Sequence, residues 1–449
     1  MLIFEKIFTV MKKALLLAAL FVITFGSGIA QTVFYSDFET WTDANTPQNW
    51  IGAATNITLT DVDQYATNPY AGTYSMQITN ATTSHKRVST TAVSVTNGAV
   101  YNVSYYVRGT GQIRSCIYKG ASGRYTAYSS YANINSTSWT KVTQTLISDT
   151  TSVTAEFVLS VMSTGATNDH LQVDSFYVST GSATSVSIHD IQYTTSDSSS
   201  YFNQPVKTGG IVSAIKSGAY WIQNGTGPWS GVYVYDNVNK PAIGDSVTFS
   251  TIVDEYYNLT ELKMVGGYVK VSSANTVQVT DINLSDGALE SYEGVLCKLT
   301  NVECTVGLNS YKEWTVGDGL SSLIVGDLIY LDSTIVAVGT HYNITGVMDY
   351  NFSERKIQPR FAADITIYSA IDETEISSSV YPNPASDFVT VSAGTEGTLK
   401  VVDMTGRVVY STSFNQSEDV NVSGMEPGIY NVMINGNDGE FAISKLIVK

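Results

Sequence analysis

Short apolar runs alternate with turn residues through the end of the chain, and this spacing limits what the segment can fold into. The runs lie at 388–391, 399–402, 408–410, 420–422, 429–434 and 441–448. Turn segments separate them, among them Glu426-Pro427-Gly428 and Asn435-Gly436-Asn437-Asp438-Gly439. Runs of this length between Gly, Pro and Asn are typical of antiparallel strands. Residues 380–449 are therefore expected to form a small Ig-like β-sandwich.

Four motifs occur in order within this segment: Tyr381-Pro382-Asn383-Pro384-Ala385, Val402-Asp403-Met404-Thr405-Gly406-Arg407, Pro427-Gly428-Ile429-Tyr430 and Lys445-Leu446-Ile447-Val448-Lys449. Together they resemble the type A C-terminal sorting domain of the type IX secretion system of Bacteroidetes. The resemblance implies export by the type IX secretion machinery, followed by removal of the tail. The protein would then be secreted or held at the outer cell surface. The alternative is an ordinary terminal β-domain.

The other end of the chain has the pattern of a targeting segment. Lys12 and Lys13 precede an apolar stretch at 14–25, and small residues follow before Gln31. This order predicts a signal peptide over 1–30, cleaved between Ala30 and Gln31. The apolar stretch is too short for a membrane anchor, and no later segment is long enough, so no transmembrane segment is expected in the mature chain.

Length and composition indicate several β-rich domains. A chain of 449 residues is too long for one core and fits three or four domains. Only 14% of the residues are charged, whereas 43% are apolar and 11% aromatic, which is enough to build those cores. The formal net charge of −16 argues against a nucleic-acid-binding surface. The three cysteines are too few for a disulfide scaffold and are expected to be free and mostly buried.

Residues 32–181 are expected to form one all-β domain, because they alternate strand and turn patterns without a helical period. Motifs run through the segment: Tyr35-Ser36-Asp37-Phe38-Glu39-Thr40-Trp41, Pro47-Gln48-Asn49-Trp50, Tyr70-Ala71-Gly72-Thr73-Tyr74-Ser75-Met76 and Leu171-Gln172-Val173-Asp174-Ser175-Phe176-Tyr177-Val178. Their order resembles the galactose-binding-like jelly rolls that serve as carbohydrate-binding modules in glycan-degrading bacteria. The resemblance implies a polysaccharide or surface glycan as ligand.

The same resemblance implies a structural calcium ion between the first and last strands of the jelly roll. Its ligands would be Glu39 and Asp174, with Asp37 or nearby backbone carbonyls completing the shell. The ion would stabilise the domain without taking part in chemistry. The alternative is a pair of solvated carboxylates at strand ends.

A cluster of tyrosines marks the candidate glycan site. Tyr118, Tyr125, Tyr128 and Tyr131 surround a Gly- and Ser-rich stretch that contains Arg124. Aromatic rings stack on the C–H faces of sugars, and neighbouring polar side chains bind the hydroxyls. The candidates for those hydrogen bonds are Arg114, Arg124 and Asn133. Core packing is the alternative, and it is preferred for Trp50 and Trp139, which are placed at strand starts.

The chain repeats itself between 184 and 369. Val186-Ser187-Ile188-His189-Asp190-Ile191 recurs as Val277-Gln278-Val279-Thr280-Asp281-Ile282, and Tyr257-Asn258-Leu259-Thr260-Glu261 recurs as Tyr350-Asn351-Phe352-Ser353-Glu354. Two similar units therefore stand in tandem, at 184–276 and 277–369. Units of this size with glycines at the bends fit OB-like β-barrels. A linker at 370–379 is expected to join them to the tail.

The first unit carries candidate ligand-stacking aromatics. Its segments Tyr220-Trp221-Ile222-Gln223-Asn224-Gly225 and Gly231-Val232-Tyr233-Val234-Tyr235-Asp236 resemble the OB-fold module that accompanies secreted bacterial nucleases. That resemblance suggests bases stacked on Trp221, Trp229, Tyr233 and Tyr235. Residues 184–369, however, hold 10 Lys or Arg against 19 Asp or Glu. Barrel packing or a neutral glycan surface is therefore preferred over a base-stacking platform.

The sequence offers no catalytic motif. Its four histidines, at 85, 170, 189 and 341, have no metal-ligand spacing, and HExxH, CxxC, GxSxG and phosphate-loop patterns are absent. The preferred interpretation is a multidomain, all-β, non-catalytic binding protein that contacts glycans through the jelly roll. The alternatives are an accessory protein for extracellular nucleic-acid processing and a structural adhesin.

Overall fold

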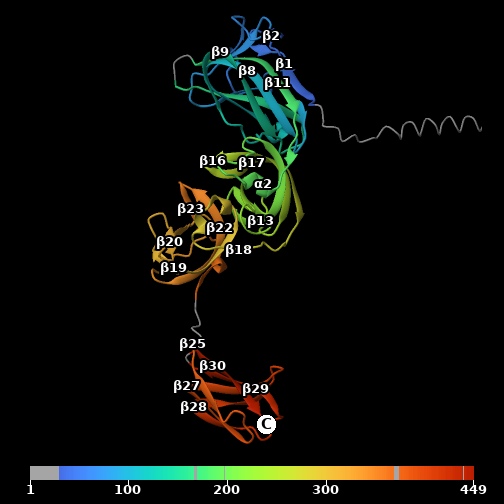
Figure 1. Cartoon of the computed structure of the whole chain (residues 1–449). Helices are drawn as coiled ribbons and strands as arrows, with labels where there is room; N and C mark the ends of the chain where they lie inside the picture. Colours follow the sequence, from blue (N-terminus) through green and yellow to red (C-terminus); the bar gives the residue numbers. More distant parts are fainter. Residues whose placement is uncertain (1–29, 166–168, 197, 369–373, 438) are drawn as a thin grey trace, which may run out of the picture. The chain divides into compact units, whose positions relative to one another are not determined.

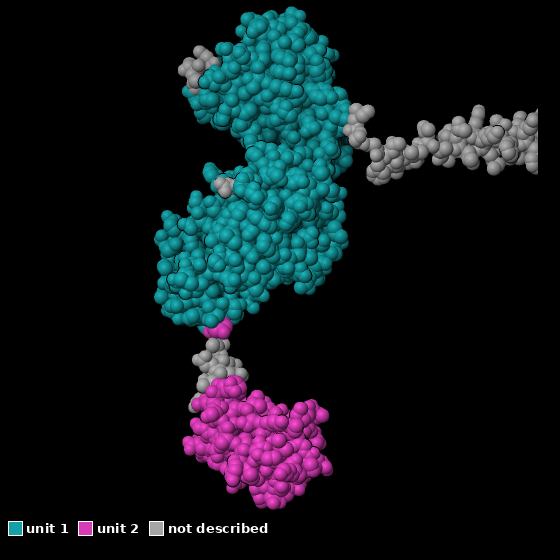
Figure 2. All heavy atoms as spheres, viewed as in Figure 1, with its two compact units in different colours: residues 1–367 teal, residues 368–449 magenta. Residues whose placement is uncertain are grey.

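The structure is a computed structural model that describes residues 30–165, 169–196, 198–368, 374–437 and 439–449. The chain divides into two compact units, one ending at Ile367 and the other running from Tyr368 to Lys449 (Figure 2). The predicted signal peptide, apart from Ala30, lies outside the described residues. No helix in the described part of the chain is long and apolar enough to span a membrane.

The jelly roll occupies the N-terminal part of the first unit (Figure 1). Its strands are β1 (Thr32–Ser36), β2 (Trp41–Asp43), β3 (Thr46–Pro47), β4 (Val62–Tyr65), β5 (Ser75–Thr79), β6 (Lys86–Ser89), β7 (Val93–Val95), β8 (Val100–Tyr118), β9 (Ala132–Ile147), β10 (Ser152–Met162) and β11 (His170–Thr180). Apart from the separate β2–β3 pair, they follow the order β4-β5-β11-β8-β10-β6. In addition, β1 pairs with β11, β7 with β10 and β9 with β8.

Strand β8 belongs to both layers of the sandwich. Its first half pairs with β11 and its second half with β10. The change of partner falls at Gly109 and Gly111, whose φ angles are 113° and 146°. A Cβ atom on Gly109 would lie 2.2 Å from the carbonyl oxygen of His170, so glycine is required where the strand bends.

Side chains along β8 point alternately into the core and out to the surface of the sandwich. Tyr101, Val103, Tyr105 and Val107 point inward and are buried, as expected for a strand with one side on the core. Trp50 is 3% exposed and packs among Phe34, Phe38 and Phe176, which confirms its predicted core position. The side chains between the inward ones, such as Tyr106, Arg108 and Arg114, point outward.

Two five-stranded barrels follow the jelly roll. The first contains β12 (Thr184–Ser185), α2 (Ile188–Gln192), β13 (Pro205–Lys216), β14 (Ala219–Gln223), β15 (Gly231–Tyr235), β16 (Ser246–Tyr256) and β17 (Leu259–Ser272). The second contains β18 (Thr280–Asp281), β19 (Leu296–Val306), β20 (Trp314–Gly317), β21 (Ser322–Val325), β22 (His341–Asn351), β23 (Glu354–Gln358) and β24 (Ile365–Ile367).

The same strand order closes both barrels. The first runs β13-β14-β15-β17-β16 and closes by pairing β13 with β16; the second runs β19-β20-β21-β23-β22 and closes through β19 and β22. This repeated order fits the predicted tandem of OB-like barrels. The matching hairpin turns lie at Tyr257–Asn258 and Phe352–Ser353, all with positive φ. The second turn is thus two residues later than the sequence repeat indicates.

The second unit is the predicted antiparallel sandwich. Its strands are β25 (Thr374–Glu375), β26 (Ser378–Tyr381), β27 (Phe388–Asp403), β28 (Val408–Asn421), β29 (Gly428–Gly436) and β30 (Glu440–Val448). The sheet order is β25-β30-β29-β27-β26, and β28 pairs with β27. Four predicted runs thus merge into two long strands, β27 and β28. Strands β25 and β26 begin the sheet inside the predicted linker, which therefore does not extend to 379.

Candidate functional site

The structure brings the predicted tyrosine cluster together on the outer side of the layer that contains β6, β10 and the second half of β8. Tyr118 and Tyr125 have ring centroids 5.2 Å apart, and Tyr125 and Tyr128 lie 6.0 Å apart. All are half-buried, because they pack over Cys116 and Val158. We call this surface, with Tyr131 and the arginines beside it, the tyrosine face.

Two arginines are held against these rings. The guanidinium of Arg114 lies between Tyr128 and Tyr131, at 4.2 and 4.1 Å from their centroids, and that of Arg87 lies 4.8 Å from the Tyr125 ring. Of the other predicted polar partners, Arg124 is exposed. Asn133 accepts a hydrogen bond from Gln112 Nε2. Burial raises the pKa of the Cys116 thiol to about 12, so this thiol is protonated and unreactive at neutral pH.

A second surface, which the sequence patterns do not indicate, lies on the opposite layer of the jelly roll. Asp63, Gln77, Gln172 and Arg108 stand directly opposite one another on β4, β5, β11 and β8, and so form one row across four strands. Side chains at directly opposed positions point to the same face of a sheet. We call this surface, together with the aromatic rings next to the row, the amide-row face.

Three aromatic rings stand beside this row. Tyr70 stacks on Tyr106 with centroids 3.5 Å apart and an interplanar angle of 13°, and Trp139 meets Tyr70 edge-on at 6.2 Å. The guanidinium of Arg108 lies 4.8 Å from the Trp139 ring. Trp139 was expected in the core at a strand start, and that prediction is wrong. It lies within β9 and points outward, where it is half-buried.

Hydrogen bonds fix the polar side chains of the amide-row face. Arg108 donates from Nε to Gln172 Oε1, and Gln172 Nε2 donates to Gln77 Oε1 over 3.1 Å. The Trp139 indole donates to the carbonyl oxygen of Asn68 over 3.1 Å. Because each group already has a partner, the surface loses little side-chain entropy when a ligand binds.

Two carboxylates hold the loop that carries Tyr70. Asp174 Oδ2 accepts hydrogen bonds from the amides of Tyr70 (2.9 Å) and Ala71 (3.2 Å). Glu39 Oε1 accepts from the amides of Thr73 (2.8 Å) and Tyr74 (3.0 Å). Burial raises the pKa of Asp174, while these amide hydrogen bonds act in the opposite direction. Both carboxylates thus position the Tyr70 ring over Tyr106.

These contacts bear on the predicted calcium ion. The oxygens of Glu39 and Asp174 face N–H groups, which would repel a cation, and Asp37 Oδ1 accepts from the Glu39 amide over 3.2 Å. Within the described ranges, no group of three or more His, Cys, Asp or Glu side chains could hold a metal ion. As they lie, the three residues do not fit calcium, and calcium binding stays a prediction.

Asp174→Asn is expected to destabilise the jelly roll by about 1–3 kcal/mol, because an amide group cannot accept hydrogen bonds at both of its ends. The measurement is the melting temperature in calcium-free buffer. Asp37→Asn is the control, since Asp37 is exposed and should have little effect. If chelation lowered the melting temperature of the unmodified protein, a cation between these carboxylates would replace the amide contacts as the explanation.

The predicted second aromatic surface is wrong for two of its members. Trp221 is 0% and Tyr233 is 7% exposed, and both pack with Val347 of the second barrel. Their rings meet edge-on at 5.1 Å. Trp229 is half-buried against Tyr193, whereas Tyr235 is 51% exposed. The second barrel covers the aromatic face of the first, which corresponds to the packing alternative.

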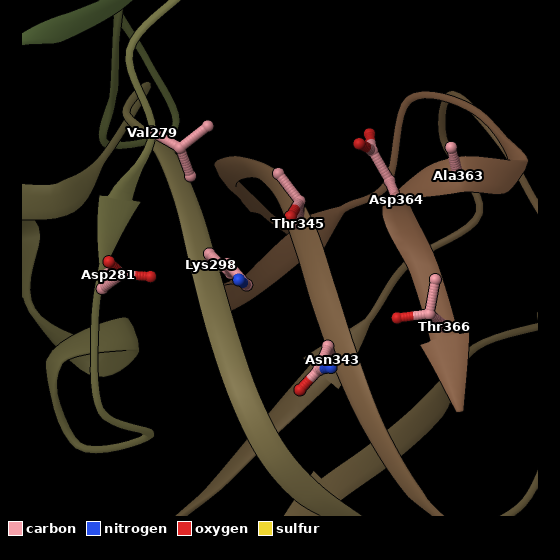
Figure 3. Close-up of a pocket in the computed structure, with 8 residues that line it drawn as sticks. All are labelled: Val279, Asp281, Lys298, Asn343, Thr345, Ala363, Asp364 and Thr366. Atoms are coloured by element: carbon pink, nitrogen blue, oxygen red, sulfur yellow. The ribbon is translucent and has the colours of Figure 1, made fainter. Parts of the chain in front are cut away.

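A separate hollow of about 430 Å³ opens on the outside of the second barrel (Figure 3). Its lining residues are Val279, Asp281, Lys298, Asn343, Thr345, Ala363, Asp364 and Thr366. Asp364 is already engaged, because it accepts two hydrogen bonds from the guanidinium of Arg360. The four histidines lie in separate places, before β6, at the start of β11, in α2 and at the start of β22.

Stacked rings beside a fixed row of amide and charged side chains form the kind of surface that binds sugars. Residues 30–166 match a family model described as a carbohydrate binding domain. Residues 379–449 match the model of the secretion system C-terminal sorting domain. The protein is therefore exported by type IX secretion, is secreted or held at the cell surface, and carries a carbohydrate-binding domain.

Solved structures similar to parts of the chain include carbohydrate-binding modules. The CBM22-1 xylan-binding domain of Paenibacillus barcinonensis Xyn10C is 17% identical, with 35% of this chain and 99% of that chain covered and a TM-score of 0.27. TmCBM61, solved in complex with β-1,4-galactotriose, is 16% identical. The match covers 29% of this chain and 88% of that chain, with a TM-score of 0.21. A comparison with curated proteins found no match.

Proposed function

We propose that the protein binds a neutral polysaccharide through the amide-row face of its jelly roll and does not cleave it. The observation that carries the proposal is the stacked group of Tyr70, Tyr106 and Trp139 beside the polar row. An exposed ring offers an apolar surface to the C–H face of a sugar, while amides and a guanidinium reach its hydroxyls. Tyr70 is 43% exposed and Trp139 is half-buried, so both rings keep some accessible surface.

The charges of this face favour a neutral ligand. The row contains one acid, Asp63, one base, Arg108, and two amides between them. Asp174 is on the same face, opposite Tyr106, but it is 0% exposed and its oxygens accept hydrogen bonds from backbone amides. A surface with balanced charge and fixed amides suits hydroxyl groups, which both donate and accept hydrogen bonds. Single-site binding of this kind is weak, and display of many copies on a surface raises the overall affinity.

The test is affinity electrophoresis of the purified chain, residues 31–449, in gels that contain xylan, mixed-linkage β-glucan or galactan. We expect at least one neutral polysaccharide to slow migration relative to a gel without polymer. Unchanged migration in all gels would remove the proposed function. Release of soluble sugar from the retarding polymer would contradict the non-catalytic part of the proposal.

In this proposal the two barrels act as a spacer, and single-stranded DNA is not expected to bind them even at low salt. The rings that could stack on bases, Trp221 and Tyr233, are covered by the second barrel. Electrostatic attraction is absent too, because residues 184–369 carry an excess of acids. Fluorescence anisotropy with a labelled oligothymidine is the measurement. Binding that weakens steeply as salt is added would favour the nucleic-acid alternative.

A further inference from the structure

The tyrosine face contains a row of groups that the neutral-glycan proposal does not use. Arg87, Ser160 and Arg114 stand directly opposite one another on β6, β10 and β8. They share the outer side of this layer, because Leu159 and Val88, one residue away, point into the core. Two guanidinium groups thus flank one hydroxyl on three adjacent strands.

Buried polar atoms in this row lack partners. The Nε atoms of Arg87 and Arg114, the Oγ of Ser160 and the hydroxyl of Tyr131 are all buried without a hydrogen-bond partner within the described residues. Ser160 is 0% exposed. Buried polar groups in native proteins are normally paired, so such a concentration in one place requires an explanation.

The arginines also lack an acidic partner. Neither Arg87 nor Arg114 forms an ion pair in the described part of the chain, and the contacts of Arg114 are the two tyrosine rings. The carboxylate on the same face, Glu156, is engaged elsewhere. Its oxygens accept hydrogen bonds from the amides of Ala53 and Ala54, each over 2.8 Å, and from Ser89.

The surroundings of His85 show the same local excess of positive charge. Burial, followed by the charges of Arg87 and Arg114, lowers the pKa of its imidazole. Arg87 Nη1 lies 3.1 Å from His85 Nε2. In a chain with a net charge of −16, two guanidinium groups that have no acidic partner within the described residues and lie near a histidine form an unusual cationic spot.

We propose that the tyrosine face is a second binding site, which recognises an oxyanion group, a carboxylate or a sulfate, on an acidic polysaccharide. A guanidinium sandwiched between two rings is fixed in orientation, and its two Nη groups, unlike the buried Nε, can meet the two oxygens of such a group. The buried hydroxyls of Ser160 and Tyr131 lie in the same row and cluster as the guanidinium groups, and the half-buried rings of Tyr125 and Tyr128 are left to face the sugar. This site lies on the opposite layer from the amide-row face and does not depend on it.

A polysaccharide is favoured over a nucleic acid because the site offers two arginines rather than an extended basic groove. A nucleic acid would require many phosphate contacts to overcome the acidic surface of the rest of the chain. One or two charged groups on an otherwise neutral polymer match two arginines and adjacent rings better.

The test measures affinity of the chain from residue 31 to 449 for polygalacturonate and for dextran sulfate at low salt, with neutral dextran as reference. We expect one or both acidic polymers to bind, and Arg114→Gln to weaken that binding about tenfold or more. Polygalacturonate identifies a carboxylate and dextran sulfate a sulfate. Lys240→Gln removes the same charge from an exposed site in the first barrel and should change nothing.

Further variants separate this site from the other face. Trp139→Ala should leave binding of the acidic polymer unchanged, and Arg114→Lys should restore only part of the affinity, because an ammonium group lacks the planar fork. If circular dichroism shows that Arg114→Gln fails to fold, Arg87→Gln replaces it, since the Arg87 guanidinium stacks on one tyrosine ring and is not sandwiched between two. Equal affinity of the arginine variants and the unmodified protein, no binding of either acidic polymer, or binding of an oligothymidine instead would overturn the proposal.

Discussion

Replacing Trp139 with alanine is expected to abolish retention of the protein on its neutral polysaccharide while leaving the melting temperature almost unchanged. The ring is half-buried on the outer side of β9 and contacts Arg108 and Tyr70, which are themselves at the surface. Removal of a central aromatic anchor from a binding surface costs about 2 kcal/mol or more, which corresponds to roughly thirtyfold in affinity. Affinity electrophoresis gives the loss of binding, and thermal unfolding gives the stability.

Two controls accompany this variant. Trp139→Phe keeps a ring at the same place and should retain part of the affinity. Tyr311→Ala removes an aromatic ring that is 76% exposed in the second barrel and should retain all of it. A melting temperature that falls together with the affinity would mean that Trp139 supports the fold, as its predicted core role required. Unchanged retention would move the site away from this face.

Replacing Trp221 with alanine is expected to lower the free energy of unfolding by about 3–5 kcal/mol, the range for buried large aromatic residues. Trp221 is 0% exposed and packs with Tyr233, Leu259 and Val347 where the two barrels meet. The cavity left by the ring would face both barrels, so neither could close it without moving against the other. Urea unfolding followed by far-ultraviolet circular dichroism is the measurement.

The matched control for Trp221 is Tyr235→Ala on the neighbouring strand, because Tyr235 is 51% exposed and should lose less than about 1 kcal/mol. Trp221→Phe should have an intermediate effect, since it keeps most of the volume of the ring. A small effect of Trp221→Ala would show that the barrels do not pack through this surface. The rings of Trp221 and Tyr233 in the first barrel would then again be available to a ligand.

Local patterns were sufficient to predict the layout of the chain. The turn motifs of 380–449 predict the sandwich of the second unit, and the internal repeat predicts two barrels with one strand order. Strand ends inside regular hairpins were harder to place. The polar residues of β28 between Ser411 and Asp419 look like a loop in sequence, but pairing with β27 extends them as strand.

The binding faces depend on strand order, which local patterns do not contain. Tyr70, Tyr106 and Trp139 are far apart in sequence. Tyr70, in the loop between β4 and β5, reaches Tyr106 because β5, β11 and β8 lie side by side, and Trp139 joins them because β9 pairs with β8. Alternation shows that a residue points to one side of its strand but not which side is covered. For that reason Trp139 was predicted inside and Trp221 was considered for a surface.

The tyrosine cluster could be predicted because its members are close in sequence. Their arginine partners could not all be found in that way, since Arg87 comes from β6 and reaches the cluster only through the pairing of β6 with β10. The same long-range pairing brings Ser160 between the two arginines. The sequence therefore indicates the rings and Arg114 but not Arg87, the second arginine beside them.

Binding of a neutral polysaccharide across the amide-row face can be seen in a crystal structure of residues 31–449 with an oligosaccharide cut from the retained polymer. We expect a sugar ring stacked on Trp139 or Tyr70, with its hydroxyls hydrogen-bonded to Arg108, Gln172 or Gln77. A sugar bound on the barrels, or on the jelly roll away from these residues, would contradict it.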